Sequence, residues 1–314
     1  MKPTNLTIII LCAMTSILIA CCSSNPADKH RDPAIGTQEP LRTQKGSQTT
    51  TFIFPPYSYN ALEVRSIFNV VMTDTADSIR IEISDELARY LSVRLHDGRL
   101  IIGLEPLGRN HTLNNPIATV SLPYNMKMNE IELCGVASFS TKLPLRSNEF
   151  EIDMSGASNL TAKYIQAAST DLSLSGTANF NCDLRTTEAD LSLSGASYYH
   201  GNITCRELDA SLSGTAAMDG TLTCKELDAT LSGASNMTMQ GSADDAELTL
   251  SGTASLSGLS VATATGIMSG VSKANIKCSN RIALTLSGTS QLTYTGNARN
   301  ECTVGRAASV IINN

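Results

Sequence analysis

The chain has 314 residues, with 23 Lys and Arg, 29 Asp and Glu, and a formal net charge of −6. This acidic balance excludes a general nucleic-acid binder, because such a protein needs a basic surface to neutralise phosphates. Aromatic residues make up only 4% of the chain and tryptophan is absent, which disfavours an aromatic platform for stacking sugars.

The N-terminus has the pattern of an export signal. Its apolar stretch, residues 6–20, is shorter than the roughly 20 residues that a membrane-spanning helix needs. The stretch ends in Leu-Ile-Ala-Cys at residues 18–21, which resembles the lipobox of bacterial lipoproteins. The resemblance implies that 1–20 is a signal peptide and that Cys21 carries a lipid that anchors the protein to a membrane. The alternatives are lipidation at Cys22, a plain secretory signal, or a retained membrane anchor.

Residues 21–50 predict a flexible tether, because they are polar, contain Pro26, Pro33 and Pro40, and show no apolar periodicity. Some surface-exposed lipoproteins of Gram-negative bacteria carry an acidic cluster just after the lipidated cysteine, and residues 23–29 lack one. The lipoprotein resemblance therefore implies the bacterial cell envelope, at the outer membrane. Both the periplasmic and the surface side stay open.

Residues 51–128 predict less regular β structure. Apolar side chains alternate with polar ones at 79–83, at 91–95 and again at 117–122, and the sequence His-Asp-Gly-Arg at 96–99 predicts a hairpin turn. We expect this segment to cap the N-terminal end of the repeat region that follows, because an uncapped stack would expose a bare strand edge.

Residues 129–314 are dominated by a short phrase, Ser-Gly-Ala-Ser or Ser-Gly-Thr-Ala, that recurs along the segment. The spacing between successive glycines falls slowly from 21 to 18 residues. A nearly fixed step of this kind predicts a solenoid, in which each turn packs only on its neighbours. The repeated glycines are Gly135, Gly156, Gly176, Gly195, Gly214, Gly233, Gly252, Gly270 and Gly288.

Within each repeat, apolar residues alternate in steps of two, as at Leu208, Ala210 and Leu212. A period of two indicates strands, and the phase slips near each glycine indicate corners. We therefore predict an all-β protein: a single-stranded parallel β-helix of about 19 residues per turn, right-handed by the crossover rule, and continuous with residues 51–128. A helical solenoid is rejected, because it needs roughly 33 residues or more per repeat. The glycines predict corners that need a positive φ or a missing Cβ.

Two parts of the chain resemble a known bacterial family. Residues 67–71, 78–83 and 91–93, with 97–102, are similar to the entry segment of the putative auto-transporter adhesin, head GIN domain family, whose second half carries Leu-Ser-Gly-Ala-Ser repeats. The resemblance spans roughly residues 60–305. It implies a β-helical lipoprotein or secreted protein of the bacterial envelope, and no catalytic residue transfers from it. The chain departs from the family name, because Ala, Thr or Val follows its glycines in place of Ile-Asn.

Counting back from each repeat serine predicts two outward-facing columns, one of carboxylates and one mainly of hydroxyls. Successive turns of a β-helix lie about 4.8 Å apart, so the members of each column are neighbours. The carboxylate column is Glu130, Glu151, Asp171, Asp190, Asp209, Asp228 and Glu247, and the second column is Glu132, Asp153, Ser173, Ser192, Ser211, Thr230 and Thr249.

Two interpretations of these columns stay open. Asp171, Asp190, Asp209, Asp228 and Glu247, with Ser192 and Ser211, are the candidate site; there they would bind a hard cation such as Ca²⁺, or present acids and hydroxyls to a glycan or an envelope protein. In the other interpretation, duplication copied a solvated surface. The cations Lys163, Arg185, Arg206 and Lys225 would then relieve the repulsion.

Cys205 and Cys224 occupy equivalent inward positions of adjacent turns, whereas Cys278 lies at a different place in its repeat. Neighbours on parallel strands seldom reach relaxed disulfide geometry, so we predict a stacked pair of buried thiols. A disulfide is the alternative in an exported protein.

The tightest aromatic cluster is Tyr198-Tyr199-His200. Alternation places Tyr199 inward and the other two side chains outward, as a contact spot or as ordinary surface.

Two classes of function follow. The first is a non-catalytic envelope lipoprotein, an adhesin or binding module without a cofactor. The alternative is a polysaccharide lyase or hydrolase, because parallel β-helices often carry such enzymes. An enzyme of that kind needs a break in the repeat, and the turns between 154 and 289 contain almost no insertions. Arg185 and Arg206 are also spread out and do not gather over the acids, so we predict a protein that is not an enzyme.

Overall fold

The structure is a computed structural model that describes residues 38–46, 48–107 and 116–313. The predicted signal peptide, 1–20, and the predicted lipidation site, Cys21, lie outside the described residues. Within the described ranges, no helix has the length and apolar character needed to cross a membrane.

The N-terminal part is a small β assembly with one short helix. Its elements are β1 (Arg42–Lys45), β2 (Thr49–Phe54), β3 (Ala61–Ser66), β4 (Asn69–Thr73), β5 (Ile79–Ser84), α2 (Asp85–Ala88), β6 (Leu91–His96), β7 (Arg99–Leu104) and β8 (Ala118–Pro123). Antiparallel pairs join β1 to β2, β2 to β5, β5 to β8 and β6 to β7. The predicted hairpin at 96–99 is present, with positive φ at both Asp97 and Gly98.

The rest of the chain is a long stack of short strands. They are β9 (Glu130–Gly135), β10 (Ser138–Thr141), β11 (Leu145–Arg146), β12 (Glu149–Met154), β13 (Asn159–Gln166), β14 (Ser169–Leu174), β15 (Asn179–Arg185), β16 (Glu188–Leu193), β17 (Tyr198–Thr204), β18 (Glu207–Leu212), β19 (Ala217–Thr223), β20 (Glu226–Leu231), β21 (Asn236–Leu250), β22 (Ser255–Met268), β23 (Lys273–Leu286), β24 (Gln291–Thr295), β25 (Arg299–Asn300), β26 (Thr303–Val304) and β27 (Ser309–Asn313).

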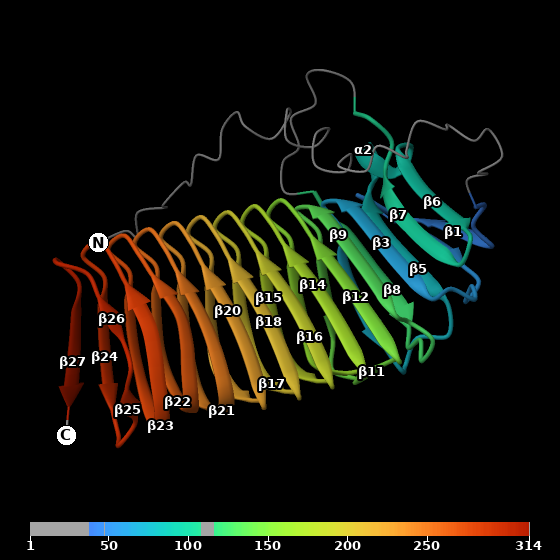
Figure 1. Cartoon of the computed structure of the whole chain (residues 1–314). Coiled ribbons are helices and arrows are strands. Elements are labelled where there is room, and N and C mark those ends of the chain that lie inside the picture. Colours follow the sequence, from blue (N-terminus) through green and yellow to red (C-terminus); the bar gives the residue numbers. More distant parts are fainter. Residues whose placement is uncertain (1–37, 47, 108–115, 314) are drawn as a thin grey trace, which may run out of the picture.

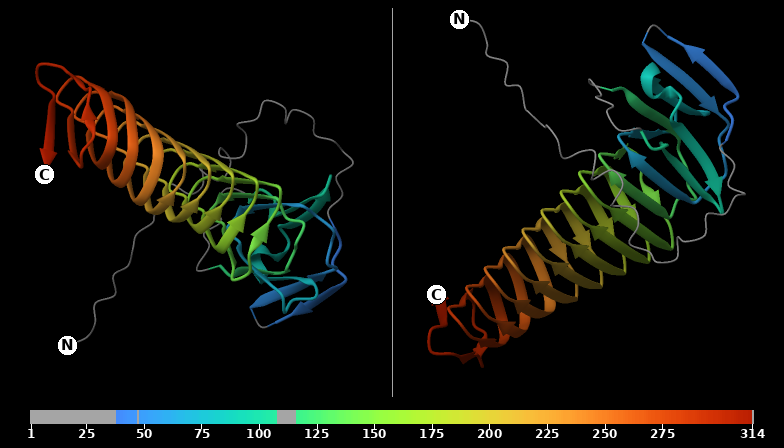
Figure 2. Two further views of the ribbon diagram at one scale, coloured as in Figure 1. Left: turned by 60° about the horizontal axis from the view of Figure 1, so that its bottom comes forward. Right: turned by 90° about the horizontal axis from the view of Figure 1, so that it is seen from above.

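These strands form the predicted parallel β-helix. Each strand pairs in parallel with the equivalent strand of the next turn, as in the series β12, β14, β16, β18 and β20. Figure 1 shows the turns stacked along one axis, with the antiparallel strands β1, β5, β6 and β7 at the N-terminal end. The two further views in Figure 2 show the same elongated rod with the cap at one end. The prediction of an all-β solenoid with an N-terminal cap is therefore confirmed.

Two expected boundaries are wrong. The expected tether, 21–50, contains β1 and the start of β2, because β2 pairs with β5 in the cap and carries β1 on its other edge. The solenoid also begins before residue 129. β3 and β4 already form a coil, since β3 pairs in parallel with β9 and β4 pairs with β10. The repeated Ser-Gly phrase is absent from this first coil, because Ser66, with φ of 79°, stands where later turns have glycine. The glycine spacing therefore does not reveal the coil.

The repeated glycine is required at each corner for two reasons. At Gly214 the φ angle is +71°, which L side chains rarely adopt. A Cβ there would also lie 2.7 Å from the carbonyl oxygen of Gly195 in the preceding turn. The same arrangement recurs from Gly156 to Gly288, so the glycines form a ladder that sets the spacing of the corners.

A buried column directly after the corners alternates between alanine and serine from Ala137 to Ser272, and a second serine, Ser290, follows in the next turn. The hydroxyls of Ser158, Ser197, Ser235 and Ser272 have no hydrogen-bond partner among the described residues. The hydroxyl of Ser290, in the same column, donates to the Ser287 carbonyl oxygen at 2.9 Å. The column runs Ala137, Ser158, Ala178, Ser197, Ala216, Ser235, Ala254, Ser272 and Ser290, and each member is buried.

Candidate binding face

The carboxylate column expected from the sequence is continuous in the structure. Strand register places each member directly beside the next, from β9 to β21, and Thr265 of β22 and Ala283 of β23 continue it without a charge. The paired residues are Glu130, Glu151, Asp171, Asp190, Asp209, Asp228 and Glu247. The residues directly before and after each of these five along its strand are buried, whereas the five themselves are exposed: Asp171, Asp190, Asp209, Asp228 and Glu247.

The hydroxyl column is also in register. Ser192 of β16 pairs with Ser211 of β18, which pairs with Thr230 of β20. Both serines are exposed and lie two residues beyond the carboxylates Asp190 and Asp209 on the same strands. The structure therefore brings together every residue of the predicted candidate site on one side of the solenoid.

A second carboxylate column lies beside the first and was missed from the sequence. Glu188 pairs with Glu207, Glu207 with Glu226, and Glu226 with Asp245. These residues stand two positions before the first column, so counting six residues back from each repeat serine would have found them. We call the two columns over β16, β18, β20 and β21 the acidic face.

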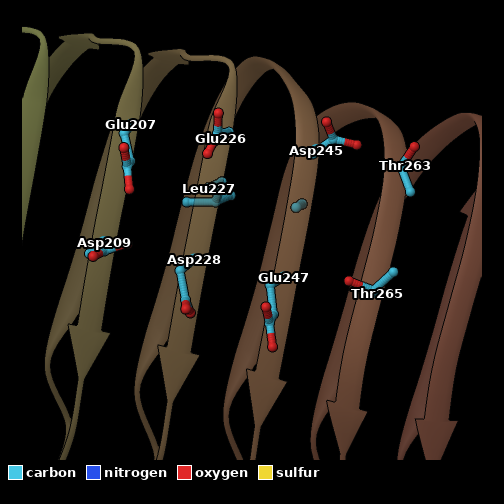
Figure 3. Close-up of a pocket in the computed structure, with 10 residues that line it drawn as sticks. Glu207, Asp209, Glu226, Leu227, Asp228, Asp245, Glu247, Thr263 and Thr265 are labelled. Atoms are coloured by element: carbon cyan, nitrogen blue, oxygen red, sulfur yellow. The ribbon is translucent and has the colours of Figure 1, made fainter.

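The acidic face includes a pocket over β18, β20, β21 and β22. Its lining combines six carboxylates with two threonines and two apolar side chains. Figure 3 shows the labelled carboxylates standing in two rows on successive strands. The lining residues are Glu207, Asp209, Glu226, Leu227, Asp228, Asp245, Ala246, Glu247, Thr263 and Thr265.

Like charges are held close together on this face. Burial and the neighbouring carboxylates of Asp228, Asp190 and Glu207 raise the pKa of Asp209. Asp171 continues the first column on β14, and burial and the carboxylates of Asp190 and Asp153 likewise raise its pKa. A raised carboxyl pKa means that the folded protein holds these charges less readily than free side chains do.

Of the four cations expected to relieve this repulsion, Arg206 does so. It forms ion pairs with Glu188 at 3.0 Å, Glu207 at 2.7 Å and Glu226 at 3.7 Å. Lys163, Arg185 and Lys225 form no ion pair with any carboxylate of the described ranges. The second column is therefore partly neutralised, whereas Asp190, Asp209 and Asp228 have no basic partner within that part of the chain.

The carboxylates of the acidic face are spread out over successive strands (Figure 3). Within the ranges that the structure describes, no group of three or more His, Cys, Asp or Glu side chains converges so as to hold a metal ion. The carboxylates stand in rows along the stack. Bridging of the columns by Ca²⁺ stays a prediction.

The aromatic cluster lies on a different sheet, with the expected orientations. Tyr199 is fully buried and stacks on Phe180, with ring centroids 5.5 Å apart. Tyr198 and His200 face outward, and both bind Oδ1 of Asp219 in the next turn at 2.7 Å. These two hydrogen bonds lower the pKa of Asp219 against the opposing effect of burial. The sequence alone did not reveal this aspartate, because it lies in a neighbouring turn.

Cys205 and Cys224 are free thiols at equivalent positions of adjacent turns, as predicted. The hydrogen bond between them, together with burial, raises the pKa of Cys224. The expectation for Cys278 is wrong. Cys205 and Cys224 belong to a column of side chains at equivalent positions, which we call the thiol column. It continues through Ala243, which pairs with Val261, and Val261 pairs with Cys278. Because the register between β22 and β23 shifts, counting residues along the repeat does not place Cys278 in this column.

The fold and the face define a class: parallel β-solenoids whose turns repeat the same surface side chains. The family model described as putative auto-transporter adhesin, head GIN domain, matches residues 58–219 and 188–298. The chain therefore belongs to that family.

Comparison with solved structures finds similar chains from two species of Parabacteroides. A putative adhesin from Parabacteroides merdae is 17% identical and has a TM-score of 0.47, over 86% of this chain and 98% of that chain. A putative lipid binding protein from Parabacteroides distasonis is 15% identical, over 86% and 98% of the two chains, with a TM-score of 0.44. A putative adhesin from the same species is 15% identical, over 84% and 97%, with a TM-score of 0.45. No curated protein gives a significant match.

Proposed function

We propose that this chain is a non-catalytic binding protein of the bacterial cell envelope, which presents its acidic face to a glycan or to another protein. The observation that carries the proposal is the pocket over β18, β20 and β21, where six carboxylates from three successive turns stand beside the threonines of β22. Membership of a family described as adhesins supports a binding role and a place in the envelope.

Electrostatics favours a partner that brings positive charge or many hydroxyl donors. Neighbouring carboxylates about 4.8 Å apart repel by roughly 1 kcal/mol in water, and by about 3–4 kcal/mol at an effective dielectric constant of 20. A partner that places Lys or Arg side chains along the rows removes that repulsion, and Ca²⁺ bridging a glycan to the rows would do the same. Because the rows are fixed on a rigid sheet, the face is organised before the partner arrives.

The proposal places the protein at the outer membrane, held by a lipid on Cys21. The lipobox-like sequence at residues 18–21 supports the anchor. The alternative function, cleavage of a polysaccharide, finds less support because β14, β16, β18 and β20 all contain six residues, and the strands β15, β17 and β19 between them all contain seven. The connections that join these strands are equally short from turn to turn. Such regularity leaves no long loops to build an enclosed active site.

The test compares the unmodified full chain with the triple variant Asp209→Asn, Asp228→Asn and Glu247→Gln. Both proteins are applied to a glycan array with and without a calcium chelator, and both are titrated with a lysine 20-mer as a cationic probe. We expect the triple variant to bind the lysine 20-mer, and any glycan that the array identifies, at least tenfold more weakly.

The control variant is Asp74→Asn, Asp77→Asn and Glu86→Gln, which removes the same charge from exposed positions in the cap. It should bind like the unmodified chain. Equal loss of binding in both variants would mean that net charge alone governs binding. Unchanged binding by the triple variant of the acidic face would show that these carboxylates are only solvated surface residues. Turnover of an acidic polysaccharide by the purified protein would overturn the non-catalytic class.

A further inference from the structure

A compact group of basic side chains surrounds one tyrosine on the sheet formed by β11, β13 and β15. The guanidinium carbon of Arg146 lies 5.6 Å from the centre of the Tyr164 ring, and that of Arg185 lies 4.5 Å from it. Arg146 Nη2 also donates a hydrogen bond to the Tyr164 hydroxyl at 2.6 Å. The two arginines come from the turns on either side of Tyr164, since Arg146 and Arg185 both pair with Gln166.

Both guanidinium groups lie beside the Tyr164 ring, and no ion pair within the described residues neutralises either of them. Neither forms an ion pair with any residue that the structure describes, whereas Arg206 has three such partners. Asp183 pairs with Tyr164 in the register, and its Oδ1 accepts hydrogen bonds from the backbone N–H and the side-chain amide of Asn202, both at 2.9 Å, which leave its negative charge in place. Two guanidinium groups without an ion pair therefore outnumber this one carboxylate, and they leave a local excess of positive charge in a chain whose net charge is −6.

Two lysines enlarge this positive surface. Lys163 precedes Tyr164 and is exposed. Lys142 is exposed too, and it follows Thr141, which pairs with Ala162, so the two lysines occupy neighbouring turns. Neither lysine forms an ion pair within the described ranges. We call Lys142, Arg146, Lys163, Tyr164 and Arg185 the basic patch.

The size and charge of the basic patch indicate which class of ligand it can bind. A guanidinium fork matches a carboxylate through two parallel hydrogen bonds, and stacking on Tyr164 holds both forks in place beforehand. Residues two turns apart are about 10 Å apart, which suits one or two anionic groups and not a long polyanion. The acidic face and the net negative charge repel nucleic acids and anionic membranes, which present charge over a much wider area.

We propose that the basic patch binds the carboxylate groups of an acidic glycan, with Arg146 and Arg185 as the contacting residues and Tyr164 as the residue that positions them. This site is separate from the acidic face, because it lies on β11, β13 and β15. It does not depend on the function proposed for that face.

The experiment titrates the full chain with a hexamer of galacturonic acid in 50 mM salt, followed by calorimetry. The fully methyl-esterified hexamer serves as the neutral probe of the same length. The double variant Arg146→Gln and Arg185→Gln should bind the acidic hexamer at least tenfold more weakly. Tyr164→Phe should weaken binding two- to fivefold, because it removes the hydroxyl that orients Arg146.

The matched control is Arg80→Gln with Arg306→Gln, which removes two exposed arginines elsewhere and should change the affinity less than twofold. The triple variant of the acidic face should bind the acidic hexamer as tightly as the unmodified chain does, so failure of one proposal can be told from failure of the other. Circular dichroism confirms that each variant is folded.

Three results would overturn the proposal. The first is equal binding of the acidic and the esterified hexamers, and the second is undiminished binding by a folded Arg146→Gln and Arg185→Gln variant. The third is that the galacturonate hexamer does not bind, whether or not a sulfated oligosaccharide of the same length binds. If vesicles of phosphatidylglycerol bind through the same arginines and the hexamer does not, the patch recognises a lipid surface and the glycan proposal is wrong.

Discussion

Gly214 shows why a corner of the repeat has no room for a Cβ atom. The sequence predicted a positive φ or a missing Cβ at the corner, and the structure requires both, since φ is +71° and a Cβ would lie 2.7 Å from a carbonyl oxygen. Backbone oxygens cannot move aside as a flexible side chain can, because the carbonyl of Gly195 already accepts the N–H of Thr215 at 2.7 Å. The glycine ladder therefore constrains every turn through its neighbour.

We predict that Gly214→Ala lowers the free energy of unfolding by about 2 kcal/mol or more, because left-handed strain and a backbone clash add. Urea unfolding, monitored by circular dichroism, measures the change. Gly103→Ala is the control, since its φ lies outside the positive range and its nearest neighbour would be the Arg65 Cβ at 3.2 Å. A loss no larger at Gly214 than at Gly103 would contradict the role of the corner.

At the scale of the element, neighbouring turns differ in where they place one hydroxyl. The turns with Ala178, Ala216 or Ala254 in the buried column carry threonine just before the alanine, and the Thr215 hydroxyl donates to the Gly195 carbonyl oxygen at 3.2 Å. Turns with serine in the column place the hydroxyl inside, where Ser197 is buried. A buried hydroxyl without a partner destabilises the fold, because it loses its bonds to water.

Replacing Ser197 by alanine should therefore raise the free energy of unfolding by about 1 kcal/mol. The same replacement at Ser290 should lower it by about 1 kcal/mol, since that hydroxyl donates to the Ser287 carbonyl oxygen at 2.9 Å. Equilibrium denaturation of the two variants provides the comparison. A destabilised Ser197→Ala variant would show that the buried hydroxyl has a hydrogen-bond partner after all.

On the scale of the whole molecule, the cap and the solenoid meet at a cluster of charges. Arg99 of β7 forms ion pairs with Glu130 and, at 3.2 Å, with Glu132 of β9, and Arg65 of β3 pairs with the buried Glu63. Burial, together with the Glu63 carboxylate, raises the pKa of Glu132 to about 7 against the opposing effect of the two arginines. Charge at this junction therefore changes near neutral pH.

The raised pKa predicts how the stability of the junction depends on pH. The folded protein binds the Glu132 proton more tightly than the unfolded chain does, so stability rises as the pH falls from about 8 towards 5. Glu132→Gln should raise the free energy of unfolding by about 1–2 kcal/mol at pH 8, and the advantage should shrink at pH 5. Urea unfolding at both values tests this, with the exposed Glu86→Gln as control. An advantage that grows at pH 5 would reverse the sign and refute the assignment.

The cap shows the limit of prediction from local pattern. Alternation at 79–83 and 91–95 predicted strands correctly, but not that β3 and β4 form the first coil. Their partners β9 and β10 lie about seventy residues further along the chain, as in the pairing of Ser66 with Gly135. No fixed step connects them, because the strands from β5 to β8 intervene.

The sequence by itself determined the solenoid, its period and the two predicted columns. A constant turn length places equal positions side by side, so Asp190 must meet Asp209 wherever the chain coils in this way. Only the tertiary structure decided which side chains contact each other between non-equivalent positions of neighbouring turns or across a bulge. The two arginines at Tyr164, the aspartate beneath Tyr198 and the place of Cys278 in the thiol column are of that kind. The physical reason is that the repeat fixes backbone register, whereas rotamers, bulges and packing between turns fix the contacts.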